Sequence, residues 1–176
     1  WLRIHTRVPV VAPDKINAEM LNALRSVKAI TMAVHANHAR EFTPKAGAAL
    51  VRLAHQGIVL LGQSVLLKGV NDTADALADL FETMMQHRIK PYYLHHPDQV
   101  TGTSHFRLPF EQGMRLMKAV RARVSGVCMP HYVVDIPGGV CKIPVTPETV
   151  RPDPDRPGNY RLYDDQGREF SYYDPI

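Results

Sequence analysis

The chain has 176 residues, of which 45% are hydrophobic and 22% charged, so it is long enough for one globular domain with a substantial core. The net charge is +4, and the basic residues are scattered without a run of five or more, which argues against a nucleic-acid surface. No apolar stretch reaches the roughly 18 residues of a membrane span. Two cysteines are too few for a disulfide framework and predict a cytoplasmic protein.

Strand-like and helix-like segments alternate through the first two-thirds of the chain. Residues 2–11 (LRIHTRVPVV) are rich in β-branched side chains and predict a first strand. Residues 15–26 predict a helix, and residues 29–35 (AITMAVH) predict a short buried strand. One face of that helix carries Ile16, Met20 and Leu24.

The next helix has clear start and stop signals. Thr43 is a good N-cap and is followed by Pro44 at the first helical position. We expect this helix to run to residues 55–56, where Gly57 ends it, and residues 58–67 (IVLLGQSVLL) to form the third strand.

Two further helices and a strand follow. Asp72 is the expected N-cap of the next helix, residues 89–95 (IKPYYLH) predict the fourth strand, and residues 110–124 predict a last long helix. The helix that begins at Asp72 has an apolar face made of Leu77, Leu80, Phe81, Met84 and Met85.

The strand starts recur about every 30 residues, which is typical of βα units in a parallel sheet. Four such units are too few to close an eight-stranded barrel, so they indicate an open α/β sheet or part of a barrel. After residue 145, four prolines predict irregular chain, and residues 159–173 predict a β-hairpin. We therefore divide the chain into residues 1–145 and a C-terminal appendage, residues 146–176.

Polar residues gather where the carboxyl ends of the predicted strands should lie, which is where α/β folds bind ligands. They are His35, Asn37 and His38, then Gln63 and Ser64, then His95, His96 and Asp98, and finally Asp135. Each has an ordinary structural alternative: a core histidine at 35, for example, or a turn acid at 98. Their recurrence at one edge favours a functional site.

The segment VDIPGGVCKIP adds a lysine to this edge. An amine such as that of Lys142 can form a Schiff base with an aldehyde cofactor once it has lost its proton, which burial favours. Gly138 and Gly139 would let a ring or phosphate come close, and Asp98 with Asp135 would suit a cationic substrate group. The spacing does not match a phosphate-binding loop.

Several of these motifs together resemble a known family. RIHTRVPVV, GQSVLLKGVND, PYYLHHPD, GTSHFR, SGVCMPHYVVD and PGGVCKIPV occur in the order and spacing of the lysine 2,3-aminomutases, which are radical S-adenosylmethionine enzymes that also use pyridoxal phosphate. The resemblance covers essentially the whole chain. It implies an α/β fold: the later four strands of a partial (β/α)6 radical-SAM barrel, with the C-terminal β-hairpin as an appendage.

The resemblance also assigns roles to individual residues. Lys142 matches the lysine that holds pyridoxal phosphate, and Asp98 and Asp135 match the acids that bind the side-chain ammonium of substrate lysine. His35 and Gln63 match positions that contact S-adenosylmethionine. The implied reaction converts L-lysine to β-lysine in a homo-oligomer. By this interpretation Asp135 and Lys142 lie on opposite sides of one pocket.

The chain departs from the family pattern in three ways. The cysteine motif that binds the [4Fe–4S] cluster is absent, as is the C-terminal zinc-binding group, so we expect a piece of a longer enzyme that is inactive alone, with no metal ligands in this chain. Position 95 is histidine where well-known members have tyrosine.

Three alternatives remain open from the sequence. The chain could be a non-catalytic ligand-binding remnant of the same fold. It could come from a relative that makes β-lysine for modification of elongation factor P. It could also be an unrelated α/β enzyme that forms a Schiff base through Lys142.

Overall fold

The computed structural model describes residues 1–174. Its larger part is built on a six-stranded sheet whose strands lie in chain order. Strands β1 to β5 are parallel, and β6 is antiparallel to β5. The strands are β1 Leu2–Thr6, β2 Ile30–His35, β3 Val59–Val65, β4 Lys90–His95, β5 His131–Asp135 and β6 Lys142–Pro144.

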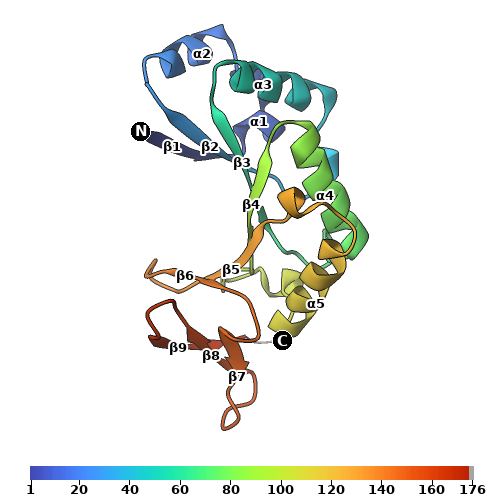
Figure 1. The fold of residues 1–176 in the computed structure, drawn as a ribbon, viewed down its shortest axis with the longest axis vertical. Helices are drawn as coiled ribbons and strands as arrows, with labels where there is room; N and C mark the ends of the chain where they lie inside the picture. Colours follow the sequence, from blue (N-terminus) through green and yellow to red (C-terminus); the bar gives the residue numbers. More distant parts are fainter. Residues whose placement is uncertain (175–176) are drawn as a thin grey trace.

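The helices follow one another along one side of this sheet, as Figure 1 shows for α3, α4 and α5. Parallel strands in chain order are joined by right-handed crossovers, which bring successive helices to the same face. The helices are α1 Val8–Val11, α2 Ala18–Arg25, α3 Pro44–His55, α4 Ala74–Gln86 and α5 Phe110–Arg121. Short 3-10 turns occur at Pro13–Lys15, Ala39–Glu41, Ser104–Phe106 and Gly126–Cys128.

Burial alternates along the central strands. In β3, Leu60 and Ser64 are buried, whereas Leu61 and Gln63 between them are partly exposed. The buried set packs against the helices, and its largest members include Met32, Leu50, Leu53, Leu77, Leu80, Phe81, Met84 and Phe110. The other face of the sheet is therefore open, and it carries polar side chains such as His35 and Gln63.

The start and stop signals of α3 are confirmed. The Thr43 hydroxyl accepts a hydrogen bond from the Ala46 amide at 3.3 Å, and Pro44 occupies the first helical position. Gly57 follows with a φ of 75°, a left-handed conformation that glycine adopts without strain.

Three local predictions were wrong. Residues Val8–Val11 form a helical turn rather than more of the first strand, because Pro9 fits the start of a helix and the Thr6 hydroxyl accepts from the Val8 amide at 3.0 Å. Thr73, not Asp72, caps α4 by accepting from the Ala76 amide at 3.1 Å.

The third correction concerns the proline-rich segment, where β7 includes Pro152. A proline is tolerated there because β7 is the edge strand of its sheet.

The number of parallel strands also differs from the expectation. The large sheet has five parallel strands rather than four, because residues His131–Asp135 continue the parallel series beside β4.

The C-terminal part forms a second, three-stranded antiparallel sheet, which Figure 1 shows below the large sheet near β6. It consists of β7 Val150–Pro152, β8 Asn159–Tyr163 and β9 Glu169–Tyr173. Phe110 at the start of α5 contacts two of its aromatic rings, with centroids 5.0 Å from Tyr160 and 5.4 Å from Tyr172. The small sheet therefore shares its apolar core with α5.

Gly113 on α5 permits a close approach to β5. A Cβ atom at this position would lie 2.6 Å from the Cζ atom of Tyr132, whose ring is buried. We expect Gly113→Ala to lower the free energy of unfolding by about 1–3 kcal/mol through overpacking. Urea denaturation would measure this. Gly126→Ala is the matched control, because its Cβ would meet nothing within 4 Å. Equal denaturation midpoints for both variants would contradict this explanation.

Candidate functional site

A cavity of about 500 Å³ lies at the carboxyl ends of β4 and β5. The loop after β4 contributes Asp98, Gln99 and Val100, and the turn after β5 contributes residues 135–139. Tyr172 of the C-terminal sheet completes the wall. Asp98 and Asp135, which the sequence placed at one edge, therefore line the same cavity.

Asp135 is the most heavily engaged side chain of this cavity. Its Oδ2 atom lies 2.6 Å from Nδ1 of His95, and its Oδ1 atom accepts a hydrogen bond from the Lys142 ammonium. Asp135 and Lys142 are register partners across the antiparallel β5–β6 pair. The expectation that they lie on opposite sides of a pocket was therefore wrong: directly opposed residues of two antiparallel strands lie side by side on one face.

Lys142 is more exposed than the sequence interpretation expected. Its side chain keeps 40% of its accessible surface, and its Nζ atom lies 5.7 Å from the ring centroid of Tyr93. The ammonium thus has a carboxylate and an aromatic face as its neighbours.

The contacts of Asp135 hold its pKa at about 2, mainly through the hydrogen bond with His95 and further through Lys142. Because the folded pKa lies below the ordinary 3.8, the stability contributed by this carboxylate is present above that value and is lost as the pH falls toward 2. We expect Asp135 to remain ionised at about pH 3 and His95→Phe to raise its titration midpoint.

Carboxyl ¹³C shifts followed by NMR would measure that midpoint. The exposed turn residue Asp165 serves as an internal reference in both proteins. An Asp135 midpoint that is the same with and without His95 would contradict the assignment of the cause.

The turn between β5 and β6 owes its shape to two glycines. Gly138 and Gly139 have φ values of 84° and 71°, and a Cβ atom on either would meet nothing within 4 Å. The backbone conformation, rather than crowding, therefore calls for glycine here. Lys142 itself is not among the residues that line the cavity, but its ammonium is held against Asp135, which is one of them. The amine therefore lies next to a carboxylate of the cavity wall, an arrangement compatible with an aldehyde cofactor.

His35 and Gln63 form a second group on the open face of the sheet. They are register partners at the ends of β2 and β3, and Oε1 of Gln63 lies 3.1 Å from Nδ1 of His5. With Arg7 and Thr6 they line a smaller cavity of about 230 Å³. Burial lowers the pKa of His35, and the nearby Arg7 lowers it further.

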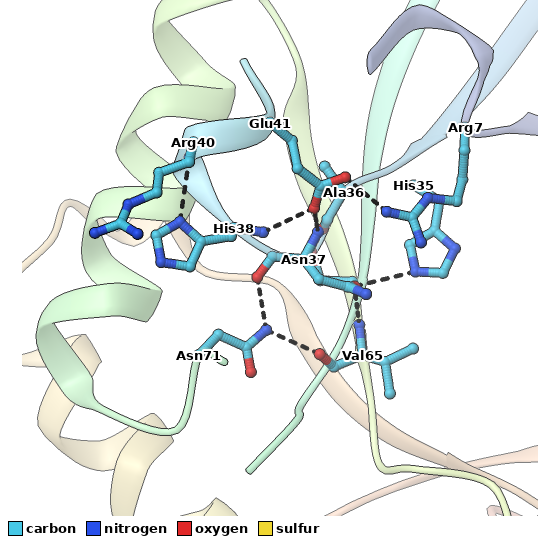
Figure 2. Close-up of polar contacts among 10 residues, drawn as sticks. Arg7, His35, Ala36, Asn37, His38, Arg40, Glu41, Val65 and Asn71 are labelled. Carbon is cyan, nitrogen blue, oxygen red and sulfur yellow. Dashed lines mark hydrogen bonds and ion pairs between the residues drawn. The ribbon is translucent and has the colours of Figure 1, made fainter. Parts of the chain in front are cut away.

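A hydrogen-bond network holds the loop after β2, as Figure 2 shows. Glu41 accepts from the backbone amides of Asn37 at 2.6 Å and His38 at 3.1 Å, and it pairs with Arg7 at 2.6 Å. Asn37 in turn places its Oδ1 atom 3.1 Å from Nε2 of His35. The network thereby fixes the position of the His35 ring.

The buried Asn71 ties the same loop to β3. Its Nδ2 atom donates to the Asn37 carbonyl at 2.8 Å and to the Val65 carbonyl at 2.9 Å (Figure 2). Sequence reasoning missed Arg7, Glu41 and Asn71. For Glu41 a signal existed, because its spacing from His38 is that of a capping box.

The two cavities belong to neighbouring strands, since Val65 at the end of β3 is the register partner of His95 on β4. Asp98 and Asp135 thus line one cavity, with Lys142 paired to Asp135, and His35 and Gln63 line the other.

Within residues 1–174, no group of three or more His, Cys, Asp or Glu side chains is arranged to hold a metal ion. Cys128 is buried and Cys141 is partly exposed. Cys128 and Cys141 do not fit an iron–sulfur cluster, which needs several thiolates together.

The described part of the chain contains no helix long and apolar enough to cross a membrane.

Comparison with known proteins identifies 2,3-aminomutases among the relatives of the chain. The chain is 39% identical over 149 residues to the L-lysine 2,3-aminomutase of Clostridium subterminale. The aligned region covers 85% of the chain and 36% of that protein. It is 40% identical over 149 residues to the L-lysine 2,3-aminomutase of Methanococcus maripaludis, covering 85% of the chain and 34% of that protein. The glutamate 2,3-aminomutase of Clostridioides difficile is 33% identical over 148 residues, covering 84% of the chain and 35% of that protein.

No family model matches the chain. Among solved structures, a radical SAM methyltransferase from Sphaerobacter thermophilus aligns with a TM-score of 0.43 and 19% identity over 65% of the chain and 38% of that structure. The chain spans about a third of the length of the three aminomutases, at 36%, 34% and 35%. The identities extend along most of the chain, which is therefore similar, over the part that it spans, to the L-lysine 2,3-aminomutases.

Proposed function

We propose that the chain is a segment of an enzyme that moves the α-amino group of L-lysine to the β-carbon, giving β-lysine. The observation that carries the proposal is the cavity shared by Asp98 and Asp135, with the Lys142 ammonium held against Asp135. We also propose that the five parallel strands are a section of a partial (β/α)6 barrel, which their single direction and chain order support.

The charge of the cavity favours lysine over glutamate as the substrate. Two carboxylates would attract a side-chain ammonium and repel a side-chain carboxylate. Asp135 is ionised at neutral pH, since its pKa is about 2. The acids therefore support lysine even though one relative is named a glutamate 2,3-aminomutase.

Residues of this chain would hold two cofactors. Lys142 would hold pyridoxal phosphate beside the glycine turn, and His35 with Gln63 would contact S-adenosylmethionine in the smaller cavity. When bound, pyridoxal phosphate would supply an electron-accepting ring, and S-adenosylmethionine, together with an iron–sulfur cluster held outside this chain, would supply a hydrogen-abstracting radical.

The Asp135–Lys142 pair suggests how the substrate ammonium gains its partner. With nothing bound, the Lys142 ammonium neutralises Asp135. If Lys142 held a cofactor instead of pairing with Asp135, the Oδ1 atom of Asp135 would be available to accept from the substrate ammonium, while His95 would hold the Oδ2 atom in place.

The test is turnover by the complete protein, purified with its native N-terminal and C-terminal extent and supplied with cofactors and reductant. Incubation with ¹³C-labelled lysine should give β-lysine by NMR, and equimolar glutamate should neither react nor compete. Conversion of glutamate instead would overturn the substrate assignment. Binding of lysine without turnover in a cluster-loaded protein would favour the ligand-binding remnant. A native role in elongation factor P modification would appear as poor turnover of free lysine.

A further inference from the structure

A buried polar cluster joins the C-terminal sheet to the segment after β4. Asp174, directly after β9, is buried together with His96 and Arg107. Its Oδ1 atom lies 3.2 Å from Nη2 of Arg107, and its Oδ2 atom lies 3.5 Å from Nε2 of His96. Phe110 closes the cluster by stacking on the His96 ring, with centroids 4.0 Å apart.

The charges in this cluster follow from its burial. Burial lowers the pKa of His96, so that the imidazole is neutral at pH 7, and burial raises the pKa of Tyr132, which remains a phenol. The Tyr132 hydroxyl lies 2.9 Å from Nδ1 of His96, and Nε2 of the same ring faces Asp174. Asp174 thus faces one cation, Arg107, and one neutral imidazole.

His96 and Arg107 flank the loop that carries Asp98. The His96 amide donates to the Val133 carbonyl at 2.7 Å, which fixes the start of the loop to β5. Inside the loop, the Gln99 side chain donates to the carbonyl of Tyr173 on β9. Asp98 itself is exposed and lines the 500 Å³ cavity. The C-terminal sheet therefore contacts the loop of Asp98 at three points. Tyr173 meets Gln99 beside Asp98, and Asp174 meets His96 before the loop and Arg107 after it.

We propose that Asp174 is a positioning residue: through Arg107 and His96 it fixes the loop that points the Asp98 carboxylate into the substrate cavity. This rests on the function proposed above, in which Asp98 binds the substrate ammonium. The C-terminal sheet is then part of the specificity machinery, because Tyr172 forms the cavity wall and Asp174 sets the geometry of an acid on another element.

The test compares Asp174→Asn with the unaltered complete protein. The amide has the shape of the carboxylate but cannot neutralise Arg107. We expect the Michaelis constant for lysine to rise about tenfold with kcat changed less than about twofold, because the acid is misplaced while the chemistry is untouched. Hydrogen exchange at residues 97–103 should accelerate in the same variant. Asp153→Asn is the matched control, since Asp153 lies in the same part of the chain and pairs with Arg161 at 3.0 Å outside the cavity.

A double variant separates positioning from simple stabilisation and keeps the test decisive if Asp174→Asn does not fold. Arg107→Met combined with Asp174→Leu removes both buried charges and restores apolar packing, which commonly preserves stability. Positioning predicts that its Tm recovers while the Michaelis constant stays high. Recovery of both, or unchanged exchange at residues 97–103 in both variants, would overturn the proposal. If the unaltered protein does not isomerise lysine, the proposed function fails, and the exchange data still decide whether Asp174 orders the loop.

Discussion

Lys142→Ala should abolish the covalent attachment of pyridoxal phosphate to the complete protein. The Lys142 ammonium is held against Asp135, which lines the cavity, and its removal leaves Asp135 without its cation. Borohydride reduction followed by peptide mass spectrometry should locate the cofactor on Lys142 in the unaltered protein and nowhere in the variant. Activity should fall by at least about 10³-fold, because covalent catalysis is lost.

Two further variants sharpen this result. Lys142→Arg keeps a positive charge for Asp135, so the fold around β5 and β6 should be retained while the cofactor is not trapped. Lys118→Ala removes an exposed lysine on α5, away from the cavity, and should leave trapping unchanged. Trapping at another lysine in the Lys142→Ala protein would refute the assignment.

The parts of the fold that were predictable depend on local chemistry. Helix α3 was found within its expected bounds because Thr43, Pro44 and Gly57 act over only a few residues. Strand β2 was found because its apolar run is short and bounded. Where two neighbouring residues could serve the same local role, as Asp72 and Thr73 do at the start of α4, the sequence did not distinguish them.

The site was predictable as a set of residues but not as an arrangement. The pairing of Asp135 with Lys142 depends on β6, a three-residue strand too short to leave a recognisable pattern. The cavity wall depends on Tyr172, which lies far from Asp98 in the sequence. The buried Asp174 gave no signal either, because an acid next to a proline usually remains solvated in a turn, and its partners come from the segment after β4.

The two cavity acids should control affinity for lysine. Asp98→Asn and Asp135→Asn each remove a negative charge facing the cavity without changing its shape, so each should raise the Michaelis constant for lysine about 10- to 100-fold. The lower end applies to Asp98, which is exposed and therefore screened by solvent, and the upper end to Asp135, which His95 holds in place.

The sharper readout is discrimination between lysine and 2-aminohexanoate, which has the same carbon chain but no side-chain ammonium. If the acids bind that ammonium, the unaltered protein should prefer lysine strongly. Each variant should lose much of this preference, because the substrate ammonium then lacks one of its carboxylate partners. Competition assays with both compounds measure it, and Asp165→Asn, in the exposed turn of the C-terminal sheet, should behave like the unaltered protein. A preference retained in both cavity variants would mean that the substrate ammonium is bound elsewhere. Asp135 would then serve only Lys142 and the geometry of the β5–β6 turn.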